Sequence, residues 1–400
     1  MARVAPSPSG EVARYFLRLG CVAFGGPAAH IALMRRELVR ERGWLSDEEF
    51  LDMLGVTNLI PGPNSTEMTM HLGYRRAGLP GLWLGGLLFI APAAAIVTAL
   101  AWAYVRYGST PAGEGVLLGA QPVVLALILQ AGWGLAGAAF RGIESAALVL
   151  AVLLLALLGV NELLLVLGAG LFAAGLWAII RLLTRSSRRS LGPLPRNRKG
   201  PRSGRGWVPF VPVSLAPAAA GAAAGASTAG LFFAFLKIGA VLYGSGYVLV
   251  SFMRAEFVEG RGWLTEAQLL DAIAAGQVTP GPLFSSAAFA GYVMGGLPGA
   301  LASAAGIFLP SFLFVMAAAP LLPRLRASQL AGSFLDGVNA GAFALILLAG
   351  VTLAADVLDR PFAIALFAGA LLLAATTRLG ALWLVLGGIA LGLAWTAAGG

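Results

Sequence analysis

The 400 residues are 58% hydrophobic and 11% charged, with a mean hydropathy of +0.85. A soluble domain carries about 25% charged residues, so this composition excludes a soluble protein and predicts a polytopic, all-α membrane protein. The net charge of +9 equals the charge of nine basic residues between positions 181 and 205, a stretch without acids, which argues against a nucleic-acid partner and indicates a topology signal.

The first apolar segment contains a break. Gly25, Gly26 and Pro27 interrupt an otherwise helical run, and non-helical backbone at membrane depth is tolerated only where protein buries it or where it lines a cavity. Arg18 lies seven residues before Gly25, about two helical turns, so it shares a face with the break. Two interpretations stay open for Arg18: a cation at a functional site within the membrane, or a side chain that snorkels to the membrane surface.

A second break follows a well-marked helix start. Ser46 with Glu49 three residues later forms a capping-box pattern, so a helix is expected to begin there and to end at Pro61-Gly62-Pro63. Two prolines around a glycine cannot continue a helix. The alternative is that this motif is an ordinary turn at the membrane surface.

The residues after this break suit an anion. A helix that restarts there presents unpaired N–H groups and a partial positive charge, and Asn64, Ser65 and Thr66 add side-chain donors. Glu67 lies one turn further and is the candidate for a coupling proton; its alternative role is to stabilise the helix N-terminus. We therefore predict an anion site formed by Pro61, Gly62, Pro63, Asn64, Ser65 and Thr66, together with Gly25, Gly26 and Arg18.

Long apolar runs account for much of the remaining chain. A helix needs about 20 apolar residues to cross the hydrocarbon core. Runs that approach this length are Gly81–Tyr104, Gly115–Ala139, Ala146–Val160, Leu163–Leu183, Gly299–Leu322, Gly332–Ala355, Phe362–Ala375 and Leu379–Ala398. With the broken segments included, we expect roughly 10–13 membrane segments.

The chain repeats itself with an offset of 219 residues, which becomes 218 after one deletion. Arg42-Gly43-Trp44-Leu45 matches Arg261-Gly262-Trp263-Leu264, and Pro61-Gly62-Pro63 matches Pro280-Gly281-Pro282. We therefore predict a first transmembrane repeat at 12–182, a basic, Pro/Ala-rich linker at 183–230 and a second transmembrane repeat at 231–400. The second half adds the candidate binding residues Lys237, Gly244, Ser245, Gly281, Ser285 and Ser286.

Arginine bias predicts opposite insertion of the two halves. Arg35, Arg36 and Arg40 lie in a loop that is less basic in the second half, whereas Arg324 and Arg326 lie where the first half has only Arg106. Inverted repeats with discontinuous or re-entrant helices are a common transporter architecture, with the substrate bound near the repeat interface. By the positive-inside rule, the basic linker at 183–206 is expected to be cytoplasmic.

The ordered set of motifs resembles the chromate ion transporter family in its long, two-domain form. The resemblance rests on the early Phe-x-Arg/Lys-x-Gly segment with its glycine break, then Arg-Gly-Trp-Leu-Ser/Thr, then Pro-Gly-Pro, in both halves. It implies an inner-membrane exporter of chromate, with sulfate as an analogue, that confers chromate resistance. Leu283 and Phe284 replace Asn64 and Ser65 in the second half, so more of the anion contact is expected on the first half.

Other functions fit less well. A sulfate or other anion importer, or a cation-coupled carrier that uses the backbone carbonyls of the breaks, stays open as an alternative. A membrane-embedded enzyme is disfavoured because the two histidines, His30 and His71, form no paired site and no phosphate-binding loop occurs. With the single cysteine Cys21, no cofactor and no metal site is expected. The expected partners are the oxyanion and the lipid bilayer, and a homodimer is left open.

Overall fold

The computed structural model describes residues 7–24, 26–57, 60–139, 142–188, 226–242, 248–319, 329–377 and 379–398. Every regular element within these ranges is helical, which confirms the all-α class. Most of the predicted linker, residues 189–225, lies outside the described residues, whereas residues 183–188 continue a helix of the first half.

The elements of the first half are α1 (Pro8–Val22), α2 (Gly26–Met34), the π-helical turn η1 (Arg35–Glu41), α3 (Asp47–Thr57), α4 (Asn64–Tyr107), α5 (Pro111–Ala139), α6 (Ile143–Leu157) and α7 (Glu162–Arg188). Those of the second half are α8 (Thr228–Val241), α9 (Val248–Met253), the π-helical turn η2 (Arg254–Glu259), α10 (Glu266–Val278), the 3₁₀ turn η3 (Leu283–Ser285), α11 (Ser286–Ala318), α13 (Gln329–Val357), α14 (Pro361–Thr376) and α15 (Ala381–Ala397).

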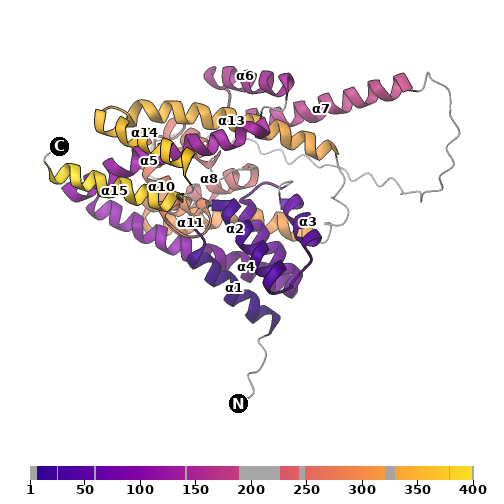
Figure 1. The fold of residues 1–400 in the computed structure, drawn as a ribbon, viewed down its shortest axis with the longest axis horizontal. Coiled ribbons are helices and arrows are strands. Elements are labelled where there is room, and N and C mark those ends of the chain that lie inside the picture. The colour runs from indigo at the N-terminus through magenta and orange to yellow at the C-terminus, as the bar shows by residue number, and fades with distance from the viewer. Residues whose placement is uncertain are drawn as a thin grey trace, which may run out of the picture.

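Within the described ranges, five helices are long and apolar enough to cross a membrane: Asn64–Tyr107, Pro111–Trp133, Glu162–Leu182, Leu283–Ala318 and Gly332–Val357. Four shorter apolar helices accompany them: Ile143–Leu157, Thr228–Val241, Pro361–Thr376 and Ala381–Ala397. Large apolar side chains on these helices are exposed, among them Trp133 at 79% and Leu171 at 67%. Such a surface suits lipid rather than water. In Figure 1, α5, α13, α14 and α15 lie together, while α1, α2, α3 and the labelled part of α4 lie on the side of the molecule where the N-terminus is.

Each half contains a long helix that folds back on itself. Gly78 in α4 has φ +63° and ψ −151°, and Gly296 in α11 has φ +63° and ψ −156°, a conformation that favours glycine. A Cβ atom on Gly73 would lie 2.1 Å from the carbonyl oxygen of Gly81, so the two arms of α4 run alongside each other in close contact. Gly291 and Gly299 repeat this contact in α11. The prolines at 80 and 92 recur at 298 and 310.

The predicted helix starts are confirmed. The N–H of Glu49 donates to Ser46 Oγ at 3.1 Å, and the N–H of Ser46 donates to the Glu49 carboxylate at 2.9 Å. Thr265 and Gln268 form the same capping box at 3.0 and 3.1 Å. The π-helical turns η1 and η2 also occupy matching positions, so the duplicated sequence produces duplicated local structure. Opposite insertion of the two halves stays a prediction.

Glycine permits the first helix of each half to approach the long helix closely. A Cβ atom on Gly20 of α1 would lie 2.7 Å from the carbonyl oxygen of Phe89, and one on Gly239 of α8 would lie 2.2 Å from that of Ile307. These are backbone atoms, so a side chain can be accommodated only if the helices separate. Close packing through small residues is the usual way in which membrane helices associate.

We predict that Gly239→Ala destabilises the protein by about 1–3 kcal/mol, because the added methyl group forces α8 away from α11. The matched control is Gly369→Ala in α14, where no atom lies within 4 Å of the added carbon. The midpoint of thermal unfolding in detergent should fall for the first variant and stay constant or rise for the second. An equal midpoint for both variants would contradict the close approach of α8 and α11.

Candidate functional site

The two Pro-Gly-Pro breaks are joined crosswise between the halves. The N–H of Gly62 donates to the carbonyl oxygen of Leu242 at 2.7 Å, and the N–H of Gly281 donates to that of Ala23 at 2.9 Å. Leu242 and Ala23 are the residues at which α8 and α1 end, immediately before the first break of each half. The Pro-Gly-Pro break of one half is therefore hydrogen-bonded to the helix end that precedes the glycine break of the other half.

The breaks lie against the long arms of α4 and α11, away from the arm ends. A Cβ atom on Gly281 would lie 2.9 Å from Ala93 Cβ, and one on Gly62 would lie 2.3 Å from Ser311 Oγ. Ala93 comes 14 residues after Leu79, and Ser311 comes 14 residues after Leu297, where the second arms begin. This distance is roughly 21 Å along a helix, so each break contacts the interior of an apolar helix.

The Pro61-Gly62-Pro63 break is followed by buried polar side chains at the N-terminus of α4. Ser65 is 1% exposed, and Thr66 and Glu67 are fully buried. Thr66 Oγ1 and both carboxyl oxygens of Glu67 accept no hydrogen bond of normal geometry from the described residues, although the Ser311 hydroxyl lies beside the carboxyl group. A Cβ atom on Gly62 would lie 2.2 Å from Glu67 Oε1, so glycine is required for the carboxyl group to occupy this place.

The surroundings of Pro280-Gly281-Pro282 differ from those of Pro61-Gly62-Pro63. The Ser285 hydroxyl donates to the carbonyl oxygen of Pro282 at 2.7 Å, and the Ser286 hydroxyl donates to that of Leu283 at 2.8 Å. Both hydrogens are therefore engaged with nearby backbone in this conformation. The N–H groups of Gly62 and Gly281 are engaged as well, in the bonds between the halves. After Pro61-Gly62-Pro63, in contrast, Thr66 Oγ1 and the Glu67 carboxyl oxygens have no partner of normal hydrogen-bond geometry in the described part of the chain.

His30 and Ser311 are site residues that sequence reasoning missed. His30 is buried, and its Nε2 lies 3.0 Å from the carbonyl oxygen of Ala23, which also accepts the N–H of Gly281. The ring stands edge-on to Phe89, with 5.4 Å between the centroids. Their positions in the sequence could have identified them: His30 follows Gly25-Gly26-Pro27 by a few residues, and Ser311 follows Pro310, the proline that matches Pro92.

Arg18 and Lys237 pair with carboxylates at repeated positions. Arg18 forms an ion pair with Glu37, and Lys237 forms one with Glu256, which is the residue 219 positions after Glu37. The basic side chains are 51% and 45% exposed, whereas the carboxylate side chains are 10% and 13% exposed. Neither ion pair includes a residue of the Pro-Gly-Pro breaks. The repetition of Glu37 as Glu256, at the same offset that relates Arg18 to Lys237, is the sequence pattern that predicts both ion pairs.

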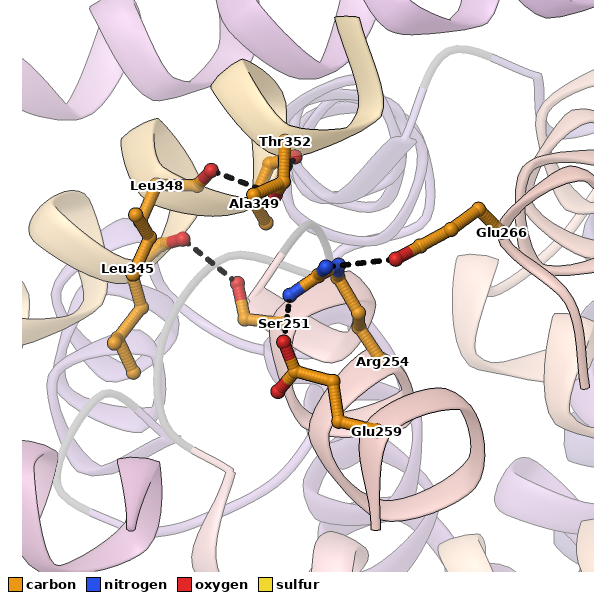
Figure 2. Close-up of polar contacts among 8 residues, drawn as sticks. All are labelled: Ser251, Arg254, Glu259, Glu266, Leu345, Leu348, Ala349 and Thr352. Atoms are coloured by element: carbon orange, nitrogen blue, oxygen red, sulfur yellow. Dashed lines mark hydrogen bonds and ion pairs between the residues drawn. The ribbon is translucent and has the colours of Figure 1, made fainter. Parts of the chain in front are cut away.

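A second repeated ion pair ties each π-helical turn to the next helix. Arg35 Nε donates to Asp47 Oδ1 at 2.7 Å, and Arg254 Nη2 lies 2.7 Å from Glu266 Oε1, again 219 positions further on. The bond from Arg35 holds the pKa of the Asp47 carboxyl group below its usual range. Figure 2 shows Arg254 between Glu259 and Glu266, with Ser251 beside it donating to the carbonyl oxygen of Leu345 on α13 at 3.1 Å.

The remaining predicted site residues either lie within the described helices and breaks or fall outside the described residues. Gly26, at φ +78°, begins α2, and Pro61, Pro63 and Asn64 flank the buried polar cluster. Gly25, Gly244 and Ser245 lie outside the described residues. Among the described residues, no group of three or more His, Cys, Asp or Glu side chains is placed to hold a metal ion.

Comparison with known proteins identifies similar sequences along most of the chain. The family described as chromate transporter matches twice, at residues 10–174 and 229–393. A chromate transport protein of Cupriavidus metallidurans is 33% identical over 370 residues, 91% of this chain and 87% of that protein. One of Pseudomonas aeruginosa is 35% identical over 83% of this chain and 77% of that protein. An uncharacterized transporter of Methanocaldococcus jannaschii is 26% identical over 78% of this chain and 76% of that protein. No solved structure matches.

The ion pair at Arg18 generates a stability prediction. Arg18→Gln should cost about 1–3 kcal/mol, because it leaves the buried Glu37 carboxylate with a weaker partner, and adding Glu37→Gln should recover most of this loss. Thermal unfolding of the single and double variants measures both effects. If the folded double variant transports at the normal rate, Arg18 serves the structure. Loss of transport in a folded double variant would instead place Arg18 on the path.

Proposed function

This chain belongs to the chromate transporter family, and on that premise we propose that it exports chromate, or a similar tetrahedral oxyanion such as sulfate, across the inner membrane. The chain is a multi-pass membrane protein and not an enzyme. The relatives named above support chromate as the substrate. Export, rather than import, and a cytoplasmic linker at 183–206 are parts of the proposal that rest on the family resemblance and on the positive charge of the linker.

The proposed anion site is the N-terminus of α4, and the observation that carries it is the buried polar cluster after Pro63. An oxyanion there would receive N–H groups of the first helical turn together with the side chains of Asn64, Ser65 and Thr66. The first two helical N–H groups are the natural donors, because those of Thr66 and Glu67 already donate to the carbonyl oxygen of Pro63, at 2.8 and 3.0 Å. Gly26, Gly281, Ser285 and Ser286 would line the site rather than donate to the anion.

Glu67 determines when this site accepts an anion. An ionised carboxylate beside the anion would repel it, whereas a protonated carboxyl group can donate a hydrogen bond to it. Burial without a cation makes the ionised form costly as well. We therefore propose that Glu67 carries a proton while the anion is bound, and that release of this proton accompanies release of the anion.

The membrane potential supplies a driving force for export. An inside-negative potential favours outward movement of negative charge by about 2.3 kcal/mol per charge per 100 mV, which is the driving force on the net single charge of a dianion that leaves with one proton. The buried Glu67 also favours a second candidate, a cation-coupled anion carrier, because an ionised carboxylate at this position would attract a cation.

The test is uptake of labelled chromate into everted membrane vesicles that hold the full chain and a membrane potential. We expect protein-dependent uptake that excess sulfate reduces. Replacing both Asn64 and Ser65 by alanine should lower uptake by about tenfold or more, because two donors to a charged ligand are lost. The matched control replaces Ser285 and Ser286 by alanine and should cost less. Absence of uptake in vesicles with folded protein would reject chromate as the substrate.

The role of Glu67 is tested with Glu67→Gln, which keeps the shape and a donor but removes the titrating group. Because the proton is released with the anion into the lumen, an acid-inside pH gradient opposes uptake, and collapsing this gradient while keeping the potential should speed uptake by the wild-type protein by about fivefold or more and leave the variant unchanged. Glu114→Gln, which removes an exposed glutamate from the first turn of α5, is the control and should behave like the wild type. Uptake by Glu67→Gln that still follows the pH gradient would exclude Glu67 as the proton carrier.

A further inference from the structure

A cavity of about 270 Å³ lies beside the C-terminal end of α4, at the opposite end of this helix from Pro61-Gly62-Pro63. Its walls come from the second arm of α4, from α5, α10, α11 and α15, and include Leu100, Val116, Phe289, Val385 and Ile389. Nearly all of its lining is apolar. It shares no residue with the proposed anion site.

One side chain in this lining is charged. Asp271 of α10 is 3% exposed, and its Oδ1 accepts a hydrogen bond from Gln121 Nε2 at 3.0 Å. Oδ2 has no partner of normal hydrogen-bond geometry within the described part of the chain, while the Tyr104 hydroxyl lies beside the carboxyl group. No lysine, arginine or histidine is among the lining residues, so nothing there compensates a negative charge.

A ligand of this cavity must therefore supply a positive charge or a strong donor together with an apolar body. Ca²⁺ and Mg²⁺ do not fit, because they take six or more oxygen ligands and the cavity offers few oxygens in an apolar wall. An anion would be repelled by Asp271. Tyr104 and Phe289, whose ring centroids lie 5.2 Å apart, present aromatic faces that attract ammonium groups.

A neighbouring cavity offers a route for a cation. Gln121, the partner of Asp271, also lines a polar cavity of about 340 Å³, and Leu117 borders both cavities. The polar cavity carries the carboxylates of Glu114, Asp356 and Asp359 against the single guanidinium of Arg360. This excess of negative charge raises the local concentration of cations.

We propose that the apolar cavity at Asp271 binds an amphipathic amine. The ammonium group pairs with the Asp271 carboxylate between Gln121 and Tyr104, and the alkyl or aryl body fills the space between α4, α10 and α15. The Gln121 bond leaves one carboxyl oxygen for the ligand. This site is independent of the proposed anion transport.

The test is calorimetric titration of the full chain in lipid nanodiscs with phenylbutylamine, with empty nanodiscs as the blank for lipid partition. We expect saturable binding by the amine and binding at least about tenfold weaker by the neutral phenylbutanol, because only the amine forms the charged hydrogen bond. Asp271→Asn should weaken amine binding by a similar factor. Asp47→Asn, which removes an exposed aspartate far along the chain, should bind the amine like the wild type.

Ala103→Leu provides a second variant that keeps the carboxylate and fills the cavity, and it should also weaken binding by the amine. It keeps the proposal testable if Asp271→Asn does not fold. Equal binding by the amine and the alcohol would assign the cavity to a lipid chain and overturn the proposal. Unchanged binding in folded Asp271→Asn, or the absence of saturable binding by the wild type, would overturn it as well.

Discussion

The two hydrogen bonds that cross between the halves are the constraint on which the rest of the structure depends. A break in an apolar helix leaves N–H and C=O groups that neither water nor lipid can satisfy. Here Gly62 donates to Leu242 and Gly281 donates to Ala23, so the breaks of one half satisfy those of the other. Neither half alone has these partners. The reciprocal bonds place the glycine of each Pro-Gly-Pro break at the contact between the two halves.

The halves follow one plan but are packed differently. Leu51 of α3 is 47% exposed, whereas Leu270, at the matching position of α10, is fully buried. After Pro280-Gly281-Pro282 the buried polar residues are Ser285 and Ser286, whose hydroxyls are bonded to backbone, whereas the described residues after Pro61-Gly62-Pro63 include the buried carboxyl group of Glu67. Duplication therefore supplied the framework, and later divergence of side chains concentrated the candidate chemistry in the first half.

Charged side chains fall into two classes by their partners. Those at the ends of the short helices form ion pairs that recur in both halves, as Arg18 with Glu37 and Lys237 with Glu256. Glu67 and Asp271 are buried and have no cationic partner among the described residues. Because a buried carboxylate without a cation is costly, these two positions are the ones that a structural role explains least well. Both proposals made above rest on them.

The sequence by itself determined the apolar spans, the duplication, the capping box at Ser46 and the Pro-Gly-Pro breaks. Capping and helix termination act within a few residues, so their signals are local. Only the tertiary structure decided the partners of Arg18 and Lys237, the contact of His30 with Ala23, and the place of Ser311 beside Gly62. Those contacts join residues that are distant along the chain or on different helices, and they exist only once the helices have packed.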